Sequence, residues 1–149
     1  MVNRFLDRVQ VFYEKLEKIS KKREAVLIWA FFAALVFGVV TVTGTLTSGF
    51  HLVDDWEFAQ YIDWMKLDQR SLWDCLRGTV SFDLTLRFRP LYYINRILMA
   101  YVFGINLTAM SVVKAAEIVA ALAALYYCAR QMKCNMVYAA LFSMTVMVG

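Results

Sequence analysis

The sequence predicts an all-α protein that is embedded in a membrane, and three observations point to this fold class. Apolar residues make up 61% of the 149-residue chain, whereas soluble globular proteins are about 45–50% apolar. Charged residues make up only 19%, and disordered chains require low hydrophobicity together with high charge. The apolar residues also occur in long runs, and the run from Ala25 to Leu46 contains no charge. A helix needs about 20 apolar residues to cross the hydrocarbon core of a bilayer.

Four apolar runs predict a polytopic helical protein with about four transmembrane helices, at residues 25–46, 91–105, 108–129 and 135–149. The fourth run is too short to span, so we expect a truncated last helix and a chain that is the N-terminal portion of a longer protein. Arg96 interrupts the second run, and we expect it to extend toward the outer head groups. Lys114 and Glu117 share one face of the third run, where they suit a structural pair.

The charge distribution predicts the orientation in the membrane. The first 24 residues contain seven Lys or Arg and four acids, whereas residues 47–90 contain seven acids and five basic residues. The positive-inside rule then places the N-terminus in the cytoplasm and the loop of residues 47–90 outside an integral plasma (inner) membrane protein. With four spans, Arg130 and Lys133 fall on the outer side, which the same rule disfavours. Basic residues beside a span favour membrane lipid as a partner, and not nucleic acid.

Residues 1–24 form the first predicted segment, a cytoplasmic amphipathic helix that precedes the membrane domain of residues 25–149. Its apolar residues recur at helical spacing with Lys and Arg on the opposite face. This pattern is typical of a helix that lies on the membrane surface. Packing of the helix against another part of the protein is the alternative.

The outer loop of residues 47–90 is too long for a simple connection and is rich in aromatic residues. Asp54 or Asp55 can cap a helix that extends to about Leu67. Ser71 begins a capping-box pattern, and we expect Gly78 to end the short helix that follows. Since tryptophan favours the membrane interface, we expect both helices to lie horizontally on the outer face.

Charged residues at the two ends of this loop are the candidates for chemistry. Asp54 and Asp55 form a carboxylate pair that can accept a proton from a hydroxyl group if burial tunes its pKa. Together with His51 they could also hold a divalent metal ion, although their spacing matches no fixed ligand pattern. Arg87 and Arg89 lie near the expected lipid head groups and offer forked donors to phosphate oxygens. Ordinary solvated loop charge is the alternative interpretation.

Three short motifs occur in a fixed order relative to the predicted spans: Val53–Phe58, Arg87–Tyr92 and Phe103–Asn106. This arrangement resembles the start of GT-C glycosyltransferases, a superfamily that includes the dolichyl-phosphate-mannose protein mannosyltransferases and the bacterial lipid A aminoarabinose transferases. The resemblance implies that Asp54 is the catalytic base or a metal-associated acid, with Asp55 as its neighbour. It also implies that Arg87 and Arg89 lie near a polyprenyl-phosphate sugar donor. Because such enzymes have many more spans, the chain would hold only part of a site and would be inactive alone.

Two functions therefore remain open at this point. The first is the N-terminal part of a cell-envelope glycosyltransferase that moves a sugar from a polyprenyl-phosphate donor to an acceptor on the outer face. The alternative is a small non-catalytic membrane protein or assembly subunit whose charged loop binds a partner. Further spans and a second acidic outer loop after Gly149 would favour the enzyme.

Overall fold

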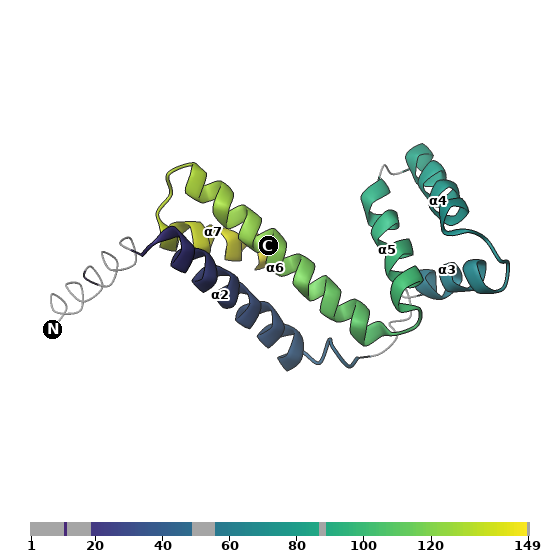
Figure 1. Ribbon diagram of the computed structural model, residues 1–149, viewed down its shortest axis with the longest axis horizontal. Coiled ribbons are helices and arrows are strands. Elements are labelled where there is room, and N and C mark those ends of the chain that lie inside the picture. Colours follow the sequence, from purple (N-terminus) through teal and green to yellow (C-terminus); the bar gives the residue numbers. More distant parts are fainter. Residues whose placement is uncertain (1–10, 12–18, 49–55, 87–88, 149) are drawn as a thin grey trace. The chain divides into compact units, whose positions relative to one another are not determined.

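The computed structural model describes residue 11 and residues 19–48, 56–86 and 89–148, and within these residues it contains six helices and no strand. The all-α prediction is therefore confirmed for this part of the chain. The helix predicted within residues 1–24 falls largely outside the described residues. Figure 1 shows the helices, which are α2 (Lys21–Val42), α3 (Trp56–Lys66), α4 (Leu72–Leu86), α5 (Pro90–Phe103), α6 (Leu107–Gln131) and α7 (Met136–Val148).

Two of the described helices, α2 and α6, are long and apolar enough to cross a membrane. They contain 22 and 25 residues, with mean hydropathies of 2.6 and 1.7 in their most apolar windows. At about 1.5 Å per residue both exceed the roughly 30 Å of a hydrocarbon core. In the most apolar 18-residue stretch of each helix, less than a third of the residues are buried inside the protein. A helix that faces lipid is expected to show this pattern, whereas the core helix of a soluble protein is mostly buried.

Of the other two predicted spans, 135–149 corresponds to the short apolar helix α7, as expected for a truncated last helix, whereas 91–105 corresponds to a helix that is too short to span. Helix α5 has 14 residues and ends at Gly104, whose φ of 58° lies in the left-handed region that glycine adopts easily. Its length is about 21 Å, too short for the hydrocarbon core. Helix α7 has 13 residues. The described residues thus contain two helices with the properties of spans, and not four.

The chain divides into two compact units, which we describe separately. The first unit comprises residues 1–42 and 114–149 and contains α2, α7 and most of α6. Its core is apolar, and the rings of Phe32 and Tyr126 meet edge to face with centroids 6.4 Å apart. Met136 and Ala139 of α7 complete this core.

Helices α2 and α6 of this unit run antiparallel, as Figure 1 shows. Glu24, in the first turn of α2, accepts hydrogen bonds from Tyr126 and Arg130 near the end of α6. The distance from the Arg130 Nε atom to Glu24 Oε1 is 2.7 Å. The basic residues that begin α2 therefore lie at the same end of this helix pair as Arg130, in the last turn of α6, and Lys133, which follows α6.

The second unit comprises residues 43–113 and contains α3, α4, α5 and the first turns of α6. Its core joins α3 to α5 through residues such as Phe58, Ile62 and Ile97. Half of the predicted capping box at the start of α4 is present, because the Asp74 amide donates to Ser71 Oγ at 3.1 Å, whereas the Asp74 carboxylate accepts from the Ser71 hydroxyl at 2.6 Å and not from the Ser71 backbone N–H group. Gly78 does not end this helix, which continues to Leu86.

Candidate functional site

The sequence-predicted site residues fall mostly outside the described part of the chain. His51, Asp54, Asp55 and Arg87 all lie there, so the geometry of the expected acid pair and metal site is not described. Among the residues that the structure does describe, no group of three or more His, Cys, Asp or Glu side chains is placed to hold a metal ion. Arg89 is described, and it directly precedes α5.

Arg89 occupies the N-cap position of α5 and is exposed. The following Pro90 suits the first helical turn, where its missing N–H group would have no partner. The Arg89 guanidinium carbon lies 5.2 Å from the ring centroid of Tyr92 and 5.9 Å from that of Tyr93. These cation–π contacts hold the charge at the start of the helix, at the surface of the unit.

Arg96, two turns further along α5, forms the central ion pair of the unit. Its Nη1 atom donates to Glu57 Oε2 at 2.7 Å, and its side chain is only 11% exposed. The guanidinium carbon lies 4.9 Å from the centroid of the Phe58 ring and 4.7 Å from that of Tyr92. Arg96 therefore points into the unit, and the expectation that it extends to the lipid head groups is wrong. A charged residue within an apolar helix usually has a partner of opposite charge. Arg96 in the apolar segment was therefore the one feature of the sequence that could have indicated this ion pair.

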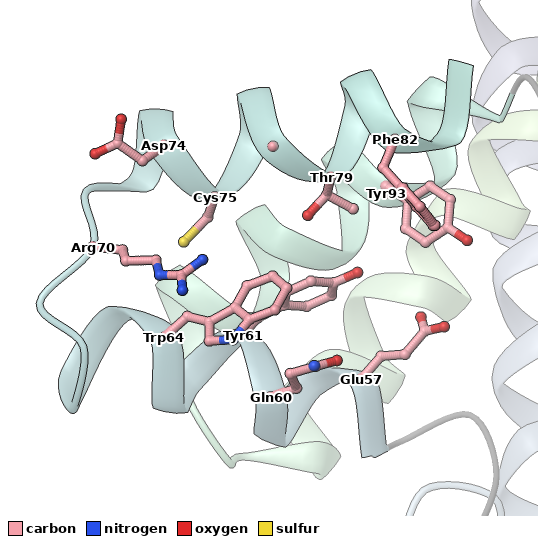
Figure 2. A pocket seen from close by; sticks show the side chains of 11 residues that line it. Glu57, Gln60, Tyr61, Trp64, Arg70, Asp74, Cys75, Thr79, Phe82 and Tyr93 are labelled. Carbon is pink, nitrogen blue, oxygen red and sulfur yellow. The ribbon is translucent and has the colours of Figure 1, made fainter. Parts of the chain in front are cut away.

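An open pocket of about 490 Å³ lies between α3 and α4, with one wall from α5 (Figure 2). Its volume falls within the range of about 300–1,000 Å³ that is usual for small-molecule sites. It was not predicted from the sequence, because its lining comes from three helices and a loop. The residues that line it are Glu57, Gln60, Tyr61, Trp64, Arg70, Asp74, Cys75, Gly78, Thr79, Phe82 and Tyr93.

The pocket combines an aromatic wall with polar groups of both charges. The rings of Tyr61 and Trp64 meet edge to face at 5.7 Å, and the Arg70 guanidinium carbon lies 5.1 Å from the Trp64 ring centroid. In Figure 2, Arg70 and Glu57 lie at opposite ends of the pocket, and Thr79 projects into it from α4. The Thr79 hydroxyl is buried and has no hydrogen-bond partner within the described part of the chain. A buried hydroxyl of this kind is costly unless a ligand or water satisfies it.

Two titratable groups of the pocket stay neutral at ordinary pH. Burial raises the pKa of the Tyr61 hydroxyl, and the nearby Glu57 carboxylate raises it further. Burial also raises the pKa of the Cys75 thiol. Since only the thiolate is a good nucleophile, Cys75 is unsuited to covalent chemistry. The pocket is therefore suited to binding by stacking and hydrogen bonds.

The geometry of this unit fits a small polar ligand with one apolar face. An aromatic ring can stack on the C–H face of a sugar ring, while amide, carboxylate and hydroxyl groups bind its hydroxyls. Trp64 supplies the ring, with the buried Tyr61 packed edge to face against it, and Gln60, Glu57 and Thr79 supply the polar groups. Comparison of the chain with protein-family models, with curated proteins and with solved structures found no match.

Proposed function

We propose that the chain forms part of a membrane glycosyltransferase of the GT-C type, which moves a sugar from a polyprenyl-phosphate donor to an acceptor on the outer face of the membrane. One observation carries this proposal. The Glu57–Arg96 ion pair joins the start of α3 to α5. The acids Asp54 and Asp55 directly precede α3 in the chain, and Arg89 directly precedes α5. The candidate acids and the candidate arginine are thus connected in the chain to two helices that an ion pair holds together.

The roles follow from the chemistry of transfer from a phosphate carrier. Asp54 takes the proton from the acceptor hydroxyl, whose oxygen then bonds to the anomeric carbon of the sugar. The bond from that carbon to the donor phosphate oxygen breaks, and the polyprenyl phosphate leaves with the electron pair. Arg87 and Arg89 stabilise the phosphate charge, and Asp55 is the neighbour of the base. The aromatic pocket of the second unit supports the proposal because it offers stacking and hydrogen bonds to a sugar ring.

We also propose that α2 and α6 span the plasma (inner) membrane with the N-terminus in the cytoplasm. Their antiparallel packing supports this orientation, because it places Lys21, Lys22 and Arg23 at the same end as Arg130 and Lys133. All five basic residues then obey the positive-inside rule, which four spans did not allow. The chain leaves α2 and enters α6 at the opposite end, so residues 43–106 lie outside and α5 does not cross.

Two substitutions test the catalytic proposal in membranes that contain the full-length protein. Asp54→Asn preserves size and removes the basic carboxylate, so sugar transfer should fall by about 10²–10⁴-fold while binding of the donor lipid changes little. Arg89→Ala should instead weaken donor binding, because a charge-assisted contact to phosphate contributes about 1.5–3 kcal/mol. Transfer of radiolabelled sugar and binding of the donor lipid are measured separately.

Asp63→Asn is the matched control, because Asp63 is an exposed acid of α3 outside the pocket. It should change neither transfer nor donor binding. Transfer near the wild-type rate in Asp54→Asn would contradict the enzyme proposal. That result would favour the non-catalytic membrane subunit, with the acids as ordinary loop charge.

A further inference from the structure

A second pocket lies in the first unit, at the end where α2 begins and α6 ends. Its volume is about 330 Å³. Three of its lining residues are cations and one is an acid, and Lys22 and Arg23 follow directly in α2. The residues that line it are Lys21, Glu24, Tyr127, Arg130, Gln131, Lys133 and Cys134.

The single acid of this pocket contributes little negative charge to its surface. Glu24 is bonded to Arg130 through two contacts, at 2.7 and 3.3 Å, and it also accepts the Tyr126 hydroxyl. Its side chain is only 12% exposed. The charges that face solvent at the pocket are therefore those of Lys21 and Lys133, both of which are exposed.

Apolar and aromatic side chains surround these cations. Tyr127 lines the pocket and is exposed, and Met132 in the turn after α6 is 79% exposed. One turn further along α2, Val26 is 64% exposed. Cations beside exposed aromatic and apolar surface are typical of the region where a membrane meets water. A soluble anion would gain nothing from that apolar surface, whereas a lipid would use both parts.

We propose that this pocket binds the phosphate head group of an anionic phospholipid, with Lys21 and Lys133 at the phosphate and the acyl chains along the exposed face of α2. The proposal is independent of glycosyl transfer and rests only on the proposed orientation of α2 and α6 in the membrane. It gives the basic residues of the first unit a ligand. A lipid bound there would also fix the depth of α2 and α6 in the bilayer.

Native mass spectrometry of the whole chain, released from a neutral detergent, tests the proposal with phosphatidylglycerol and phosphatidylcholine as probes. The wild-type protein should bind phosphatidylglycerol more tightly than phosphatidylcholine. The double variant Lys21→Gln, Lys133→Gln should bind phosphatidylglycerol about 25-fold more weakly, at about fivefold per lysine. Its affinity for phosphatidylcholine should stay the same.

Two controls make the result specific. Lys66→Gln removes an exposed lysine of α3 in the other unit and should leave both affinities unchanged. Lys133→Arg keeps the charge and should bind as the wild type does. Circular dichroism establishes that each variant keeps its helix content. Equal phosphatidylglycerol affinity in the wild type and the double variant would overturn the proposal, as would displacement of the lipid by inorganic phosphate at a similar concentration.

Discussion

At the scale of single residues, Arg96 determines how the second unit is held together. Its charge is almost completely buried, yet it has a carboxylate partner and lies over two aromatic rings. Arginine suits this environment better than lysine, because its planar group can stack and form hydrogen bonds at the same time. Removing one partner of such a pair leaves a charge in a poorly solvated place.

We therefore expect Glu57→Gln to destabilise the protein. The variant leaves Arg96 without a negatively charged partner and replaces the charge-assisted hydrogen bond with a weaker one to an amide oxygen, which should lower the free energy of unfolding by about 1–3 kcal/mol. Thermal unfolding of the whole chain in detergent, followed by circular dichroism, measures the effect. Asp63→Asn changes an exposed acid of the same helix and should leave the midpoint unchanged. Equal midpoints for Glu57→Gln and the wild type would show that the ion pair does not stabilise the unit.

Residue types near this site were predictable, but their partners were not. The acids before α3 and the arginines before α5 stand out in the sequence because they flank apolar segments. The pairing of Glu57 with Arg96 joins residues 39 positions apart, and it depends on how α3 packs on α5. The Thr79 hydroxyl likewise gains its significance only from burial in a pocket that three helices build.

At the scale of elements, Gly78 and Gly104 show why a glycine alone does not end a helix. Gly104 has a φ of 58° and ends α5, where its N–H group bonds to the Ala100 carbonyl at 2.9 Å. Gly78 lies in the middle of α4. Its helical cost of about 1 kcal/mol is offset by neighbours such as Leu72, Cys75 and Leu76, which pack into the core of the unit. The sequence pattern predicted both α3 and α4. The end of α4 at Leu86 depends on packing within the unit, which the sequence pattern does not show.

Gly78→Ala should stabilise the protein. A Cβ atom at this position meets nothing within 4 Å, and alanine is favoured over glycine in a helix interior by about 0.5–1 kcal/mol. The midpoint of thermal unfolding should therefore rise. Gly104→Ala is the contrasting variant, because the positive φ there strains any residue with a Cβ atom, and its midpoint should fall. A lower midpoint for Gly78→Ala would mean that the wall of the pocket does not tolerate a methyl group.

At the scale of the whole molecule, counting apolar runs gave about four spans with the last truncated, whereas two helices of the described residues are long and apolar enough to cross a membrane. The run that became α5 is apolar for another reason, since Ile97, Met99 and Ala100 build the core of the second unit. Periodicity alone cannot distinguish a short buried helix from a span. The packing of α2 against α6 adds information that the sequence did not contain. The contact between Glu24 and Arg130 brings two basic segments that are distant in the sequence to the same end of this helix pair.

The two arrangements predict opposite locations for the turns at the two ends of α6, and cysteine labelling in intact cells distinguishes them. In a background of Cys75→Ala, Cys128→Ser and Cys134→Ser, a cysteine at Ile105 should react with a membrane-impermeant thiol reagent. A cysteine at Met132 should react only after the cells are permeabilised. Both positions are highly exposed, at 72% and 79%, so that access depends on the side of the membrane and not on burial.

Asp68→Cys provides the control for this experiment, because residue 68 lies outside under both arrangements and its side chain is half exposed. It should be labelled in intact cells, which establishes that the reagent reaches the outer face. With four spans, Ile105 would be protected and Met132 labelled, since the turn between the second and third spans would be cytoplasmic. That pattern would overturn the two-span orientation. Because the lipid pocket needs the basic end in the cytoplasmic leaflet, labelling at Met132 from outside would also remove the anionic surface that makes that site favourable.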